Sequence, residues 1–280
     1  LSTTFAAAMA ADTIPAARRG EGIGYFGLGS TVAMAMAPAF GIALLTDVSP
    51  AALFICSGVL SLLAFGAVMV YHNETEQPVT TIHSSIKNRL YEFGTGIPAI
   101  FTILFGAAYG GVNTFIAMMA NEAGIRGAGL FFFFGTCFIF ISRPFGGRLL
   151  DKKGAFVIVM SGAVLYLGSL LIIIQSASLT MLLAASIFYG LGAGLLLPAL
   201  MTWMLNVVRA DRRSAASATF YNMLDIGTST GILALGGAAG IVGYIAMYWF
   251  VAGIMLLFLA FGVFQHFICA KARDLEEVKD

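Results

Sequence analysis

The segment from Arg212 to Asp225, RRSAASATFYNMLD, aligns without gaps with the segment from Arg18 to Thr31, RRGEGIGYFGLGST, at an offset of 194 residues. The two segments share the Arg-Arg pair and one phenylalanine, three identities in all. Each opens an apolar stretch that is rich in glycine or alanine. We therefore expect an internal repeat, and the helices within the offset give its size.

The composition around these segments is typical of a membrane protein. Hydrophobic residues make up 59% of the 280 residues and charged residues only 10%, against about 25% charged residues in a soluble domain. The net charge of +1 provides neither a basic face for nucleic acid nor an acidic tail. Cys56, Cys137 and Cys269 lie far apart in apolar stretches, so we expect small buried side chains rather than a disulfide or metal site.

The spacing of charged and histidine residues counts the helices, because a transmembrane helix needs about 20 mostly apolar residues. Four intervals hold one helix each: 22–46, 48–71, 93–121 and 127–147. Two longer intervals, 154–208 and 214–265, hold two helices each, separated by the turn QSASLT and by the glycine-rich GGAAGIVG. The sequence predicts an all-α integral membrane protein with eight complete spans and part of a ninth at residues 1 to about 14. We expect Phe115 and the run 131–134 to face lipid.

Basic residues indicate the orientation, because Lys and Arg are retained on the cytoplasmic side of short loops. Thirteen of the fifteen basic residues fall on alternate connections. The opposite connections contain one basic residue, Arg126, and the remaining one, Arg143, lies within a span. We therefore expect the basic face, and with it the C-terminus, to be cytoplasmic.

The repeat also predicts the domain organisation. The offset contains six spans, the size of the parallel half-repeats found in one class of transporters. In this register Leu1 matches Leu195, midway through a helix. We therefore expect about 100 residues upstream of Leu1 and twelve spans in the intact protein. Residues 1–71 would end the first half, 72–92 form the linker, 93–270 the second half and 271–280 a cytoplasmic tail.

Two motifs indicate a family. The sequence reads Gly147-Arg148-Leu149-Leu150-Asp151-Lys152-Lys153-Gly154 after one span, and Ala37-Pro38-Ala39-Phe40-Gly41 within another. The first resembles the G-x-L-x-D-R-x-G-R-K loop of the major facilitator superfamily, with Ala155 at the next basic position. The second is similar to the G-P-x-x-G motif of its drug-exporting proton antiporters, with alanine replacing the first glycine. The resemblance implies a bacterial efflux-type member in the inner membrane, covered from the middle of span 4 to span 12.

Asp225 is the first candidate for transport chemistry. It lies twelve residues past Arg213, or ~18 Å along a helix, which is near the middle of a bilayer. Ionisable groups at this depth are usually functional, and burial makes a carboxylate a suitable proton site. Asn222 lies one turn earlier and can donate a hydrogen bond to it. The alternative is a structural hydrogen bond between helices.

Three further residues are candidates for a substrate cavity. Tyr109 and Asn113 are four residues apart and share a helix face suited to a ligand, although packing between helices explains them equally. Arg143 either extends to the cytoplasmic headgroups or faces a cavity, where it would bind an anionic substrate group or Asp225.

The loop motif suggests a gate. The resemblance implies that Asp151 caps or pairs with the start of span 5, near Arg18, Arg19 and Gly20, when the transporter is open to the outside. Arg148 and Lys152 belong to the same motif at the membrane surface, although ordinary cytoplasmic charge explains Lys152 and Lys153 equally. Four pairs of glycines four residues apart predict close helix contacts: Gly106 and Gly110, Gly190 and Gly194, Gly227 and Gly231, Gly236 and Gly240.

These features favour a secondary active transporter that moves a small organic solute by alternating access, with proton-coupled efflux as the first hypothesis. Uptake or facilitated movement of a sugar or metabolite remains open, as do a non-transporting sensor and a channel. An enzyme is not expected, because the three histidines are scattered and no HExxH motif or nucleophile elbow occurs. We expect no cofactor or metal, partners limited to solute, protons and lipid, and a monomer at full length.

Overall fold

The computed structural model describes residues 48–70 and 93–277, together with positions 14, 15, 18, 21–23, 25–27, 29, 33 and 44. By their contacts, residues 1–31 and 86–280 form one compact unit, and residues 32–85 form a second. The predicted linker 72–92 and the motif residues Ala37, Pro38 and Gly41 lie outside the described residues, and so does Arg19.

The second unit contains helix α3 (Pro50–Val70). Its start follows from local chemistry, because Pro50 supplies the fixed φ favoured in the first turn and Ser49 Oγ accepts a hydrogen bond from the amide of Ala52 at 3.1 Å. Its large apolar side chains are exposed, among them Phe54, Leu62 and Phe65. An apolar surface on every side is typical of a helix surrounded by lipid.

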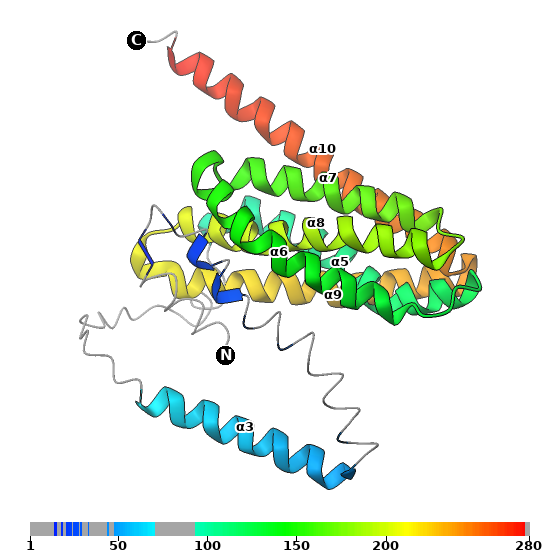
Figure 1. The fold of residues 1–280 in the computed structure, drawn as a ribbon. Coiled ribbons are helices and arrows are strands. Elements are labelled where there is room, and N and C mark those ends of the chain that lie inside the picture. Colours follow the sequence, from blue (N-terminus) through cyan, green and yellow to red (C-terminus); the bar gives the residue numbers. More distant parts are fainter. Residues whose placement is uncertain are drawn as a thin grey trace. The chain divides into compact units, whose positions relative to one another are not determined.

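Six long helices form the bundle of the first unit (Figure 1). They are α5 (Gly96–Glu122), α6 (Gly129–Lys153), α7 (Ala155–Ile174), α8 (Leu179–Asn206), α9 (Arg213–Val242) and α10 (Tyr244–Glu277), with short 3-10 turns η3 (Phe93–Thr95) and η4 (Ala210–Arg212). The C-terminal part of α10, drawn in red, extends beyond the neighbouring helices.

Seven helices in the described part of the chain are long and apolar enough to cross a membrane. They are α3 and α5 to α10, and they lie in the intervals predicted for seven of the eight complete spans. The eighth, predicted at 22–46, and the partial span at its N-terminal side lie mostly outside the described residues. The totals of eight and twelve therefore stay predictions.

Two turns show how the long intervals are divided. The predicted break at QSASLT is confirmed, because α7 ends at Ile174 and α8 begins at Leu179, with Ser178 Oγ accepting from the amide of Met181. The predicted glycine-rich break is confirmed at the last residue of GGAAGIVG, since α9 continues to Val242 and Gly243 leaves the helix, at φ +86°. A residue with a Cβ is strained at such a φ, so the turn requires glycine at this one position.

The core of the bundle is aromatic. Phe101 and Phe105 of α5 are fully buried, as are Tyr166 of α7 and Phe258 of α10. Phe101 and Phe258 meet edge to face, with ring centroids 4.8 Å apart. The rings bring the three helices together over a wide contact area.

Expectations about exposure were wrong for four residues. Phe115 is 7% exposed and Phe131 is fully buried, because Phe131 packs on Tyr189 of α8 with ring centroids 5.1 Å apart. Cys56 and Cys137 are exposed on their helices instead of buried. An apolar sequence does not distinguish a residue facing lipid from one facing another helix.

The predicted glycine contacts are confirmed for three of the four pairs. A Cβ added to Gly227 would meet the backbone of Ile103, and one added to Gly231 would meet the backbone of Ala107. Gly106 and Gly110 make the reciprocal contacts, and Gly190 and Gly194 approach α6 in the same way. In the fourth pair, Gly236 lies near Phe115, whereas Gly240 has open space around it. Small residues therefore bring α5 to α9 and α6 to α8.

Candidate functional site

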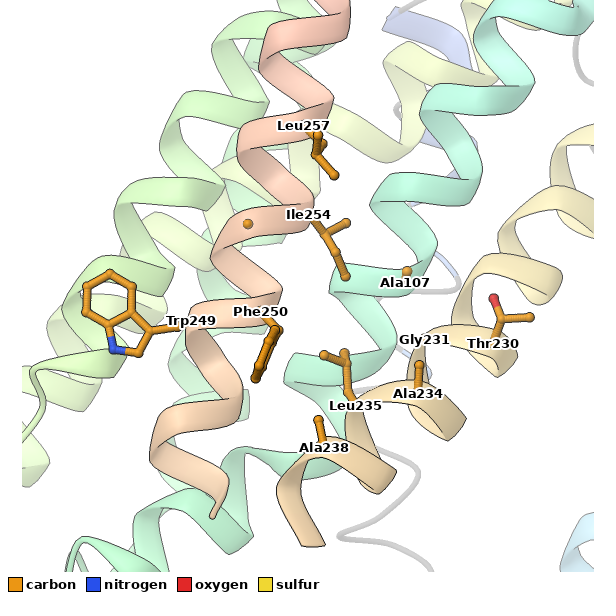
Figure 2. A pocket seen from close by; sticks show the side chains of 11 residues that line it. Ala107, Thr230, Gly231, Ala234, Leu235, Ala238, Trp249, Phe250, Ile254 and Leu257 are labelled. Atoms are coloured by element: carbon orange, nitrogen blue, oxygen red, sulfur yellow. The ribbon is translucent and has the colours of Figure 1, made fainter. Parts of the chain in front are cut away.

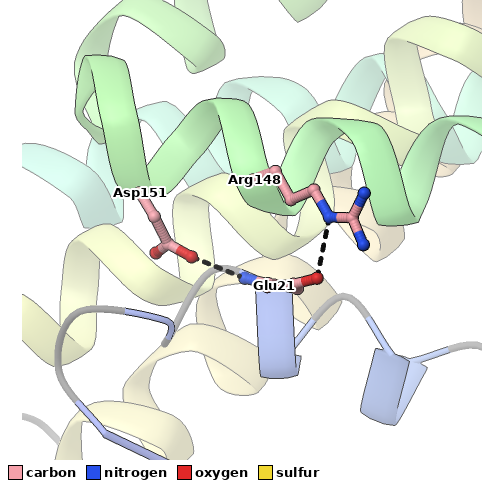
Figure 3. A network of polar contacts seen from close by, with 3 residues as sticks. All are labelled: Glu21, Arg148 and Asp151. Atoms are coloured by element: carbon pink, nitrogen blue, oxygen red, sulfur yellow. Dashed lines mark hydrogen bonds and ion pairs between the residues drawn. The ribbon is translucent and has the colours of Figure 1, made fainter.

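Glu21 is held by two residues of the predicted gate loop (Figure 3). Its backbone amide donates to Asp151 Oδ2 at 3.1 Å, and its carboxylate forms an ion pair with Arg148, with Nε and Oε1 2.8 Å apart. Helical backbone is described at 21–23, 25–27 and 29. The Asp151 carboxylate lies at the start of this helical segment, where a negative charge interacts favourably with the free amides and with the helix dipole. We call Glu21, Arg148 and Asp151 the Glu21 junction.

The surroundings of the Glu21 junction are open and charged. A cleft of about 410 Å³ is lined by Arg18, Lys152 and the three junction residues. Of the three positions near which the sequence predicted an Asp151 contact, Arg18 lies beside the junction, and Arg19 and Gly20 lie outside the described residues. The sequence did not single out Glu21, although its position three residues after Arg18 lies next to the predicted Asp151 contact.

The two motif glycines have different local roles. Gly147 is buried within α6. Gly154 ends that helix at φ +83° and ψ +158°, and its amide donates to the carbonyl of Leu150 at 2.9 Å. This backbone conformation is open to glycine and strained for other residues. Gly154 therefore sets the turn that directs α7 back along α6.

One face of α6 connects the junction to the interior of the bundle. Arg143, Gly147 and Asp151 are four residues apart and so lie on the same face. At one end of this face Asp151 contacts Glu21. At the other end the Arg143 guanidinium packs against Gly27, where an added Cβ would overlap its Nη1 atom. The same helical segment thus contacts α6 at two levels.

Arg143 is deeply buried. Only 9% of the residue is exposed, and its Nε atom has no hydrogen-bond partner in the described part of the structure. Tyr109 of α5 and Tyr221 of α9 are close enough to interact electrostatically with the guanidinium. The guanidinium therefore lies within the bundle, and a place for it in a substrate cavity stays a prediction.

Tyr109 and Asn113 belong to a polar cluster that also includes Tyr189 of α8. The rings of Tyr109 and Tyr189 are nearly parallel, 8° apart, with centroids separated by 6.3 Å. Asn113 Nδ2 donates to the Tyr189 hydroxyl at 3.0 Å and to the carbonyl of Tyr109 at 2.8 Å. The sequence did not single out Tyr189, although it is a polar aromatic residue beside Gly190 in an otherwise apolar stretch.

Asp225 and Asn222 are both exposed on α9 within this unit. They lie away from the face that packs on α5 through Gly227 and Gly231. Among the described residues the two ion pairs are Arg148 with Glu21 and Arg209 with Asp211, so Arg143 and Asp225 are not paired. Within the same residues, no three His, Cys, Asp or Glu side chains gather in a possible metal site.

A separate apolar groove of about 700 Å³ lies between α5, α9 and α10. Figure 2 shows Phe250 and Ile254 of α10 directed toward Leu235 and Ala238 of α9, while Trp249 points away. The only hydroxyl among its lining residues is that of Thr230. None of the candidate polar residues lines this groove.

Comparison with known proteins identifies the bundle. The family model of the Major Facilitator Superfamily matches residues 1–232 and, in a second match, residues 99–268. The solved structure of the human organic anion transporter MFSD10 (TETRAN) has a TM-score of 0.77 at 15% identity, and the match covers 92% of this chain and 67% of that chain. The major facilitator transporter FucP in the outward conformation has a TM-score of 0.68 at 14% identity, with coverage of 93% and 72%. No curated protein matches the chain significantly.

The family match includes far more than half of the residues. The two structural matches show the same fold over nearly the whole chain, at identities too low to transfer a substrate. With the seven apolar helices, the family match indicates a multi-pass membrane transporter. The chain therefore belongs to the major facilitator superfamily.

Proposed function

We propose that the protein is a secondary active transporter that exports a small organic solute in exchange for protons, by alternating access. The observation that carries the proposal is the Glu21 junction, in which the C-terminal end of α6 holds the start of another helix 130 residues earlier in the chain. Such a contact has two states, made and broken. Alternating access requires a two-state contact of this kind at one end of the pathway.

The charge distribution supports an orientation for this gate. Arg18, Arg148 and Lys152 surround the junction, and basic residues are retained on the cytoplasmic side. With this orientation, the junction closes the cytoplasmic end while it is intact. Breaking it would open the substrate pathway to the cytoplasm.

Proton coupling is assigned to Asp225. Its helix packs on α5 through glycines, and the Asp225 side chain stays on an uncovered face of α9. A carboxylate near the middle of the membrane changes its proton affinity as its exposure to water changes. Protonation from one side and release to the other would then drive solute in the opposite direction.

The test is transport by the full-length protein in inside-out membrane vesicles with an imposed proton gradient. Asp225→Asn should abolish gradient-driven accumulation and keep solute exchange in the absence of a gradient. Asp211→Asn is the matched control, because Asp211 lies in the short turn η4 and pairs with Arg209. Undiminished gradient-driven transport by Asp225→Asn would remove the proton assignment, and accumulation only in vesicles of the opposite orientation would replace export by uptake.

A further inference from the structure

Arg143 is a buried cation whose counter-charge is not supplied by the carboxylates that the structure describes. Five acidic side chains are described up to residue 267. Glu21 pairs with Arg148, Glu122 accepts from the amide of Tyr244, Asp151 accepts from the amide of Glu21 and Asp211 pairs with Arg209. The fifth, Asp225, is not within ion-pair distance of Arg143.

A buried charge is costly unless a counter-charge compensates for the hydration that burial removes. The structure nevertheless holds the Arg143 guanidinium in this buried position. Gly27 allows the guanidinium to approach the backbone, and the neighbouring tyrosines contribute only partial charges. A transported anion would offset the cost each time it binds, and its planar acidic group would match the guanidinium fork.

The cluster of Tyr109, Asn113 and Tyr189 indicates what the rest of such a solute would be. Tyr109 is stacked on Tyr189, and Asn113 both donates to the Tyr189 hydroxyl and accepts from it, at 3.0 and 3.2 Å. Because these polar atoms are already hydrogen-bonded to each other, the cluster presents mainly ring surface. Ring surface next to a cation suits an aromatic or apolar body that carries one acidic group.

We propose that Arg143 is the anion-binding residue of the substrate cavity and that the solute is a small organic anion with an aromatic or apolar body. The proposal rests on the transport function and narrows its substrate class. The acidic group binds the guanidinium, and the ring of the solute lies against Tyr109.

Binding to the purified full-length protein tests this with matched probes. Benzoate and naphthalene-2-sulfonate are the anions, benzyl alcohol is the neutral analogue and benzylammonium the cationic one. In calorimetric titrations at least one anion should bind saturably while both analogues do not. Arg143→Gln should weaken anion binding about 10- to 100-fold, as expected for loss of a hydrogen bond to a charged group, and Arg143→Lys should restore part of it.

The matched control is Arg126→Gln, which removes an equal charge from an exposed turn and should leave anion binding unchanged. Ligand-free Arg143→Gln should melt at or above the temperature of the unaltered protein, because it removes an unpaired charge. Absence of saturable binding by both anions, equal binding of benzylammonium, anion binding that survives Arg143→Gln, or a lower melting temperature of that variant would each overturn the proposal. Gradient-driven transport that depends on Asp225 would in those cases still support the proton-coupled carrier.

Discussion

Asp151 contacts a backbone amide, whereas Arg148 contacts a side chain of the same residue, Glu21. The backbone contact survives any substitution of Glu21 other than proline, so the two contacts can be broken separately. A carboxylate near a helix start contributes about 0.3–1 kcal/mol. That amount changes a two-state equilibrium by roughly 2- to 5-fold.

The first prediction concerns this equilibrium. Asp151→Ala should raise the labelling rate of a cysteine introduced by Arg18→Cys by about 2- to 5-fold, because the junction opens more often. Glu21→Gln should have a smaller effect, since Arg148 is well exposed to solvent and its ion pair is screened. Labelling is measured with a maleimide in a background without the three native cysteines. Asp211→Asn serves as the control for charge, and equal rates in Asp151→Ala and the parent would contradict a gating contact.

Gly27 provides a second prediction, because it limits where the Arg143 guanidinium can lie. An alanine Cβ at this position would overlap Nη1, which is the end of a flexible side chain and can move aside. Gly27→Ala should therefore weaken anion binding several-fold and leave the melting temperature nearly unchanged. Gly29→Ala is the matched control, since its Cβ would enter open space. Titration of benzoate or naphthalene-2-sulfonate measures the effect, and identical affinities in the two variants would contradict it.

Individual residues also show what the sequence alone could not decide. Arg143 lies four residues before Gly147 in a helix that ends near the expected membrane surface. This position is compatible both with a side chain that extends to the headgroups and with one that faces a cavity. The direction of the side chain depends on Gly27, more than 100 residues away in the sequence. Tyr189 was missed for a similar reason, because its partner Asn113 lies on a different helix.

At the scale of the elements, the contact between α5 and α9 depends on the absence of side-chain atoms. Gly227→Ala should destabilise the protein by about 1–3 kcal/mol through overpacking, because the new Cβ would meet the backbone of Ile103, which cannot turn away. Gly237→Ala on the same helix is the control, as nothing lies within 4 Å of its Cβ position. Thermal unfolding in detergent compares the two variants. A Gly227→Ala protein as stable as Gly237→Ala would contradict the contact.

The helices themselves were largely predictable, because charged side chains are expensive in a bilayer and therefore mark helix ends. The intervals 48–71 and 93–121 correspond closely to α3 and α5. The end of α9 was not predictable in the same way. Glycines within GGAAGIVG are tolerated in a membrane helix, and only the φ of +86° at Gly243 identifies the one that turns the chain.

At the scale of the whole molecule, the loop motif led to the family that the family match shows, while the six-span repeat stays a prediction. The solute could not be predicted in the same way. A binding cavity combines side chains from distant helices, so its chemistry depends on packing, as the cluster of Tyr109, Asn113 and Tyr189 illustrates.

Orientation in the membrane is a property of the whole molecule, and it decides the direction of transport that the Glu21 junction would control. Short turns join α5 to α6, α6 to α7 and α7 to α8, so consecutive helices alternate in direction and place Arg126 and Arg209 at opposite ends of the bundle. Both residues are exposed, which makes Arg126→Cys and Arg209→Cys suitable reporters. The exposed Cys56 and Cys137 must first be replaced, together with Cys269.

Because basic residues stay in the cytoplasm, a membrane-impermeant maleimide added to intact cells should label the Arg126→Cys variant. The Arg209→Cys variant should react only in inside-out vesicles, where the Arg126→Cys variant should be protected. The reverse pattern would place the Glu21 junction on the outer side. In that case an intact junction would close the outer end of the pathway and leave the pathway open to the cytoplasm.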